Sequence, residues 1–115
     1  MFPNNKFRII NRDGKFAGIP GEFYLEQNIP NPFSKQTRIC FSIPRQCAIK
    51  LVIYNLHEEV ESVLYDGDLS PGKYNMIWYG SDANGYPLKD GSYVYYLEAE
   101  SFLASRRLTI RRNHI

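Results

Sequence analysis

The most informative stretch of this chain, residues 72–97, reads GKYNMIWYGSDANGYPLKDGSYVYYL. Two runs within it alternate with a period of two, on either side of a loop dense in turn residues. Alternation of this kind, in segments rich in aromatic and β-branched residues, predicts two β-strands that each bury one face. We expect strands near 72–79 and 91–99 to pair as the central hairpin of the domain. The residues expected in the core are Tyr74, Met76 and Trp78 from the first run and Tyr93, Tyr95 and Leu97 from the second.

Shorter segments repeat this pattern through the rest of the chain. Besides an extended segment at 23–27, the alternation predicts strands at 38–44, 47–55, 60–65 and 104–110, with a long turn at 66–72. Their expected inward residues are Ile39, Phe41, Ile43, Ile49, Leu51, Ile53, Leu108 and Ile110. No helical period of useful length is visible. We therefore expect an all-β, immunoglobulin-like antiparallel β-sandwich of about seven strands.

The 115 residues are enough for one domain with one core. We interpret residues 1–21 as a linker or the remnant of an upstream region, with a candidate strand near 7–10, and residues 22–115 as the domain. No signal-peptide pattern and no apolar run of the ~20 residues that span a bilayer is present. Two locations stay open: cytoplasmic if Met1 is the true start, or secreted or at the cell surface through the periplasm if a signal-bearing precursor continues upstream.

Charge and cysteine content exclude several classes of function. A net charge of +2 creates no strong field, so no affinity for nucleic acid or membranes is expected. Cys40 and Cys47 are expected on neighbouring strands, one facing out and the other in, which argues against a disulfide. His57 and His114 lack ligand partners at zinc spacing, and Asp82–Gly85 is expected to form a plain turn rather than a calcium loop. We expect no catalytic residues, no metal site and no cofactor.

Three surface features suggest binding roles that have plain structural alternatives. The Asn-Ile-Pro-Asn-Pro-Phe segment at 28–33 is a recognition element or, as we favour, an irregular end-plug, because its prolines remove backbone donors. Exposed tyrosines suggest a sugar-binding platform, with Tyr79, Tyr86 and Tyr96 as its members. The third feature is a basic C-terminal patch of Arg106, Arg107, Arg111 and Arg112. It contacts a translocon, an acidic partner or anionic headgroups, or it is simply a solvated face with a frayed tail.

A set of motifs in a fixed order resembles a known family. The residues that carry it are Asn28, Pro30, Asn31, Pro32 and Phe33, then Tyr54 and Asn55, then Gly72, Trp78 and Gly80, and finally Asn84, Gly85, Gly91, Tyr93 and Tyr95. Between about Glu22 and Ile110, the chain resembles the C-terminal sorting domain of the type IX (Por) secretion system. This family lies within the immunoglobulin-like group that includes the Ig-like domain of the flagellar hook-capping protein.

The resemblance implies a seven-stranded sandwich at the C-terminus of an exported protein, recognised by an outer-membrane translocon. The expected function is therefore non-catalytic sorting of an attached cargo. The alternatives are an Ig-like structural or interaction module, such as a hook-capping component or a linker domain of a surface enzyme, and then a carbohydrate-binding module. The chain departs from the family pattern in having Tyr79 for a common Asp, His57 and Glu58 for a common turn Gly, and residues 111–115 beyond Ile110.

Overall fold

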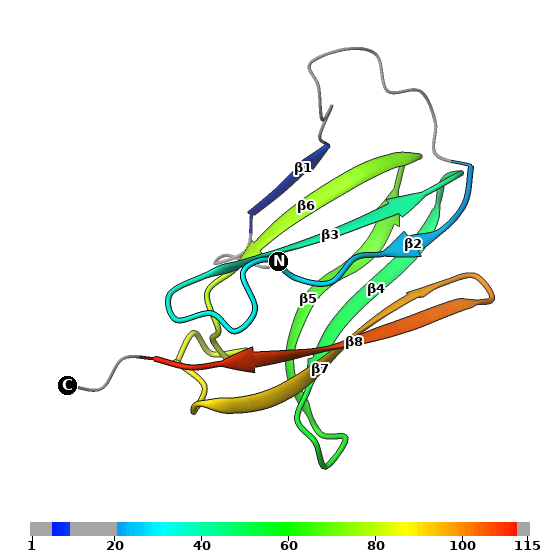
Figure 1. The fold of residues 1–115 in the computed structure, drawn as a ribbon. Coiled ribbons are helices and arrows are strands. Elements are labelled where there is room, and N and C mark those ends of the chain that lie inside the picture. The colour runs from blue at the N-terminus through cyan, green and yellow to red at the C-terminus, as the bar shows by residue number, and fades with distance from the viewer. Residues whose placement is uncertain (1–5, 10–20, 113–115) are drawn as a thin grey trace.

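The computed structural model describes residues 6–9 and 21–112, and within these ranges it contains eight β-strands and no helix. The strands are β1 (Lys6–Ile9), β2 (Tyr24–Leu25), β3 (Thr37–Ile43), β4 (Cys47–Tyr54), β5 (Val60–Leu69), β6 (Gly72–Trp78), β7 (Gly91–Ala99) and β8 (Phe102–Ile110). They form two four-stranded antiparallel sheets with the orders β1-β6-β3-β2 and β5-β4-β7-β8 (Figure 1). This architecture confirms the prediction of an all-β sandwich. Nothing in the described residues provides a helix long and apolar enough to cross a membrane.

The core lies between the two sheets and is built from the alternating residues of both. Each inner face contributes every second side chain, as the period of two requires when one side of a strand is covered. The buried residues with the largest side chains are Trp78, Tyr95, Phe41, Leu25, Ile39, Ile43, Ile49, Leu51, Ile53, Leu64, Met76 and Leu97. All the residues expected in the core from the two runs at 72–97 are buried, which confirms their predicted orientation.

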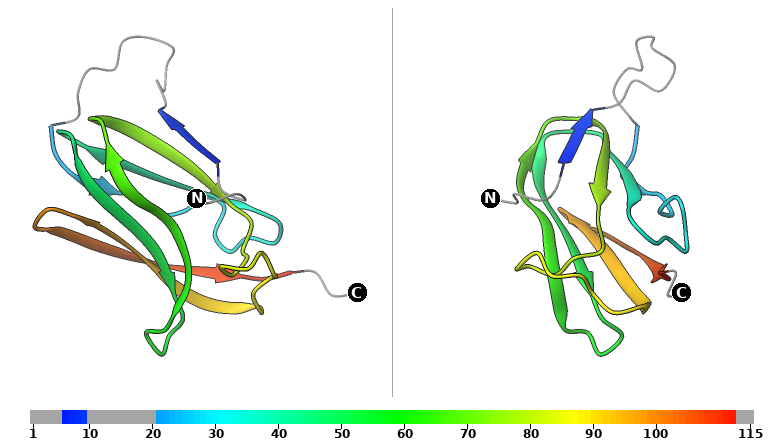
Figure 2. Two further views of the ribbon diagram at one scale, coloured as in Figure 1. Left: turned by 180° about the vertical axis from the view of Figure 1, so that it is seen from behind. Right: turned by 90° about the vertical axis from the view of Figure 1, so that its left-hand side faces the viewer.

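The predicted central hairpin is wrong, because β6 and β7 belong to different sheets. β6 pairs with β1 and β3, whereas β7 pairs with β4 and β8. The intervening residues 79–90 carry the chain from one sheet to the other (Figure 2). Alternation identifies the buried face of a strand, but a hairpin and a crossover between facing sheets bury the same side chains.

The same correction applies to the predicted pairing of the two cysteine-bearing strands. β3 belongs to the first sheet and β4 to the second, so Cys40 and Cys47 do not face each other across a hairpin. Neither cysteine forms a disulfide within the described residues, and both are partly exposed. The short turn at residues 44–46 therefore joins the two layers at one end of the sandwich, rather than two neighbours in one sheet.

Two boundaries also differ from the prediction. Residues 66–69 continue β5 instead of forming a long turn, since Asp66 and Asp68 lie opposite Lys50 and Ala48 of β4. β5 is an edge strand, where aspartate and glycine are tolerated because one side of the backbone stays open to water. In addition, β8 begins at Phe102 rather than near residue 104. The candidate strand near 7–10 corresponds to β1, which pairs with β6.

Candidate functional site

The strand β8 is covered along its free edge by the Asn-Ile-Pro-Asn-Pro-Phe segment at 28–33. The Phe33 N–H donates to the Thr109 carbonyl at 3.0 Å, and the Arg111 N–H donates to the Phe33 carbonyl at 2.8 Å. The Asn31 side chain accepts a hydrogen bond from the Thr109 N–H at 2.9 Å. Since β8 is the last strand of its sheet, these bonds satisfy backbone groups that an edge strand otherwise leaves open.

Asn28 shapes the motif segment from within the protein. Its side chain is 1% exposed, and its amide donates to the Pro30 carbonyl at 3.1 Å and to the Thr37 hydroxyl at 3.0 Å. The Gln27 amide donates to the Asn28 side-chain oxygen and to the Arg107 carbonyl of β8. A buried amide must be hydrogen-bonded to offset its desolvation, and this network provides those partners.

Phe33 closes this end of the core against the only tryptophan. Its ring is buried and lies 5.8 Å from the Trp78 ring, with the planes tilted by 57°. The Trp78 Nε1–H donates to the Ser81 carbonyl at 3.2 Å, so the polar edge of the indole is also satisfied. The prediction that Phe33 plugs the end of the core is confirmed.

Gly80 lies where Phe33, β8 and the chain beyond β8 come together. Its φ angle is +70°, which is the left-handed region that favours glycine. A Cβ atom there would lie 3.0 Å from Nη2 of Arg112 and 3.3 Å from the Phe33 ring. Both the backbone conformation and the lack of space therefore require a glycine two residues after Trp78.

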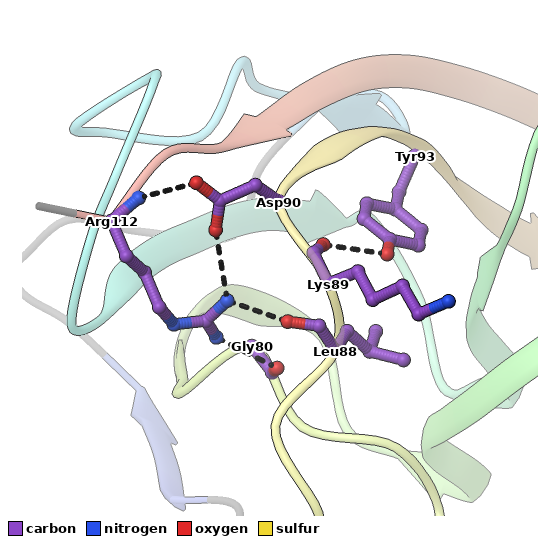
Figure 3. A network of polar contacts seen from close by, with 6 residues as sticks. All are labelled: Gly80, Leu88, Lys89, Asp90, Tyr93 and Arg112. Atoms are coloured by element: carbon purple, nitrogen blue, oxygen red, sulfur yellow. Dashed lines mark hydrogen bonds and ion pairs between the residues drawn. The ribbon is translucent and has the colours of Figure 1, made fainter. Parts of the chain in front are cut away.

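Arg112 fastens the chain just beyond β8 to the crossover, in an arrangement that we call the Arg112 clamp (Figure 3). The Arg112 guanidinium donates to the carbonyls of Leu88 and Gly80, and it lies 3.5 Å from an Asp90 carboxylate oxygen. The other Asp90 oxygen accepts the Arg112 backbone N–H at 3.0 Å. The clamp was not anticipated, because its acceptors are mostly backbone carbonyls that only the crossover brings to this position.

The four arginines of the predicted basic patch separate into two pairs. The Arg106 guanidinium donates to the Leu25 carbonyl and lies over the Tyr24 ring, and Arg112 forms the clamp. Arg107 and Arg111 are exposed, and neither guanidinium has a polar partner within the described residues. Only the second pair is therefore available to a binding partner.

The turn after Ile-Tyr-Asn is organised by its asparagine. The Asn55 side-chain oxygen accepts the N–H groups of His57 and Glu59, and its amide donates to the Glu59 carboxylate. Glu58 has a φ angle of 64° in this turn. Glu58 therefore adopts a left-handed conformation, which ordinarily favours glycine.

The remaining candidates occupy structural positions. The Asp82 carboxylate accepts the N–H groups of Asn84 and Tyr86, and Gly85 has a φ angle of 89°, which confirms the predicted plain turn. Gly72 and Gly91 begin β6 and β7. Among the described residues, no group of three or more His, Cys, Asp or Glu side chains is arranged to hold a metal ion. His114 lies outside the described residues.

Burial raises the pKa of three core tyrosines, Tyr74, Tyr93 and Tyr95. The effect is largest for Tyr95, whose hydroxyl donates to the Glu26 carbonyl at 2.6 Å. The Tyr93 hydroxyl donates to the Lys89 carbonyl beside the Arg112 clamp (Figure 3). These hydroxyls anchor the segments next to β2 and β7, so the tyrosines serve the fold rather than a sugar platform.

The predicted platform of Tyr79, Tyr86 and Tyr96 is not assembled as one site. Tyr79 and Tyr86 are exposed in the crossover, at 40% and 68%. Tyr96 instead lines a pocket on the outer face of the second sheet with Tyr54, and neither Tyr79 nor Tyr86 is part of that lining. The chain matches no protein-family model, no curated protein and no solved structure.

Proposed function

We propose that residues 22–115 form a non-catalytic sorting domain, which directs an attached protein through the type IX secretion system to the cell surface or medium. The proposal rests on the ordered motifs that resemble this family. The structural observation that supports it most strongly is that two of these motifs, the segment at 28–33 and the glycine after Trp78, lie against β8 and its end. Asn31 and Phe33 cover its edge, while Gly80 accommodates the Arg112 clamp at its end.

A sorting signal that is read as a folded module must present its C-terminal strand in one fixed geometry. The covered edge and the Arg112 clamp provide this, because they hold β8 at both its side and its end. Arg107 and Arg111 extend from this rigid frame into solvent. We assign recognition by the outer-membrane apparatus to these two guanidinium groups, because the docked strand fixes their backbone positions before the complex forms.

A fusion tests the proposal. Residues 22–115 are attached to the C-terminus of a reporter that carries an inner-membrane signal, and the fusion is expressed in a host with a type IX system. We expect the reporter at the surface or in the medium, and in the periplasm when the system is disabled. If the reporter stays in the periplasm of the intact host while the domain resists proteolysis there, the sorting proposal is wrong. The domain would then be a structural or interaction module of the same fold.

A further inference from the structure

The outer face of the β5-β4-β7-β8 sheet contains a pocket that the sorting proposal does not involve. Its volume is about 290 Å³, close to the ~300 Å³ at which small-molecule sites begin. Three strands and the β4–β5 turn contribute to it. The lining residues are Lys50, Val52, Tyr54, Glu58, Tyr96, Glu98 and Leu103.

The floor of the pocket is apolar and its wall is aromatic. Val52 points to the outer face and is nevertheless only 4% exposed, because its neighbours cover it. The Tyr54 and Tyr96 rings meet edge to face, with centroids 5.1 Å apart and planes at 80°. Such a pair is stabilising and fixes the orientation of both rings. Leu103, 63% exposed, extends the apolar surface to the rim.

Among the described residues, the side-chain polar groups of Lys50, Glu98, Tyr54 and Tyr96 in the pocket have no partner, in contrast to Arg45 and Arg112 at the ends of the sandwich. Lys50 lies directly opposite Glu98 in the β4–β7 register, yet the two side chains form no ion pair within the described part of the chain. Elsewhere, Arg45 pairs with Glu100, and Arg112 with Asp90. The Tyr54 and Tyr96 hydroxyls likewise have no hydrogen-bond partner among the described residues.

Glu58 reaches the pocket from a turn whose conformation is constrained. The Asn55 side chain holds the N–H groups on either side of Glu58, at His57 and Glu59. Glu58 itself has a left-handed backbone, a conformation that costs a non-glycine residue free energy and is concentrated at functional sites. The carboxylate is therefore placed at the pocket by a rigid turn rather than by a mobile loop.

We propose that this pocket binds a neutral glycan of one or two rings, independently of sorting. A sugar ring has an apolar face of C–H groups, which fits against Val52 and the tyrosine rings, and a rim of hydroxyls. The Lys50 ammonium donates to hydroxyl oxygens, and the carboxylates of Glu58 and Glu98 accept from hydroxyl groups. With one cation and two anions in the lining, the pocket disfavours acidic sugars.

The test is a titration of the full 115-residue chain, followed by amide chemical shifts, with cellobiose, maltose, lactose and N,N′-diacetylchitobiose as neutral probes. A disaccharide that contains glucuronic acid serves as the charged probe. We expect at least one neutral probe to shift the amides of Val52, Tyr96 and Leu103 in a saturable manner, and the charged probe to bind more weakly. Shifts elsewhere, no saturable shift with any neutral probe, or a preference for the acidic disaccharide would overturn the proposal.

Matched variants separate the pocket from unspecific effects. Tyr96→Ala should weaken the binding of the neutral probe by about tenfold or more, and Glu98→Gln should weaken it while the ring pair stays intact. Tyr86→Ala, which removes an exposed tyrosine outside the pocket, should leave the affinity unchanged. If Tyr96→Ala does not fold, the affinity of Glu98→Gln for the neutral probe is the deciding measurement. Equal affinities for Glu98→Gln, Tyr86→Ala and the parent would refute the assigned site. Export of the reporter fusion should be the same with and without Glu98→Gln.

Discussion

Gly80 illustrates how single residues determine the end of the sandwich that holds the C-terminal strand. It follows the buried Trp78 by two residues, adopts a left-handed backbone and leaves space for both Phe33 and Arg112. Trp78 supplies the large buried ring against which Phe33 packs. Packing and backbone geometry therefore explain why these residues occur here, and their role is to hold the end of β8 in position.

Replacing Gly80 with alanine should destabilise the domain by about 1–3 kcal/mol, because the left-handed backbone is unfavourable for alanine and the Cβ meets Phe33. Urea unfolding followed by Trp78 fluorescence measures this change. Gly21→Ala is the matched control, since a Cβ there meets nothing within 4 Å and the φ angle is ordinary. Equal stability of the two variants would show that Gly80 is not under conformational constraint.

Truncating Trp78 to alanine should lower the free energy of unfolding by about 3–5 kcal/mol, because it leaves a cavity beside Phe33 in the core. Domains of this kind are stable by only about 5–15 kcal/mol in total, so the loss is a large share. Chemical unfolding followed by far-UV circular dichroism provides the measurement. A loss below about 1 kcal/mol would be inconsistent with the central place of Trp78 in the core.

Tyr95 should make stability decline at alkaline pH. Burial raises its pKa in the folded state above that of an unfolded tyrosine, which is about 10. The stabilisation is complete below pH ~10 and is lost above it, because the unfolded chain releases the proton first. Tyr95→Phe should lower the free energy of unfolding by about 1 kcal/mol at neutral pH. Above pH ~10, the variant should lose less stability than the parent, because it has no hydroxyl at this position to titrate. Parallel stability curves for parent and variant between pH 8 and about 11 would refute this assignment, and Tyr86→Phe should follow the parent.

β8 shows how an element at a sheet edge can be made rigid by segments distant in sequence. Residues 27–33 cover its open side, and the crossover supplies the acceptors of the Arg112 clamp. At the opposite end, Arg45 pairs with Glu100 beside the β7–β8 turn and lies over the Phe23 ring. β8 is therefore fixed at both ends and along its edge, which an isolated edge strand would not be.

Arg112→Ala should destabilise the domain by about 1–2 kcal/mol, since it removes charge-assisted hydrogen bonds at a partly exposed site. Hydrogen exchange should also become faster at the Arg111 amide, which depends on the docked strand end. Arg107→Ala is the control, because it removes an exposed guanidinium of β8 without a described partner and leaves residue 111 unchanged. The clamp would be ruled out as a fastening device if both variants exchanged and unfolded like the parent.

At the scale of the whole molecule, the second sheet, β5-β4-β7-β8, carries both surfaces to which we assign binding. One end presents β8 with its exposed arginines, and the outer face of the second sheet presents the aromatic pocket. β1 and β8, the first and last described strands, belong to different sheets and so lie in separate layers of the sandwich (Figure 1).

Sequence patterns predicted which faces are buried but not which strands are neighbours. Tyr74 and Tyr95 would face the core whether their strands paired in one sheet or lay in two facing sheets. The alternation of residues along each strand therefore does not distinguish a hairpin from a crossover between sheets. Asp66 and Asp68 were interpreted as turn residues because their edge-strand position depends on the partner β4. The clamp and the pocket combine residues from segments far apart in the chain, and such sites become visible only with the topology.

The most direct measurement compares two charge-reversed versions of the reporter fusion in a host with a type IX system. One carries Arg107→Glu with Arg111→Glu at the C-terminal strand, and the other carries Arg38→Glu with Lys73→Glu on the opposite sheet. Both change the net charge equally, and protease resistance verifies that both are folded. We predict that the second fusion reaches the surface or medium like the parent, and that the first stays in the periplasm. Export of both at the parental level, or retention of the folded parent itself, would contradict the claim that the docked β8 is the sorting signal.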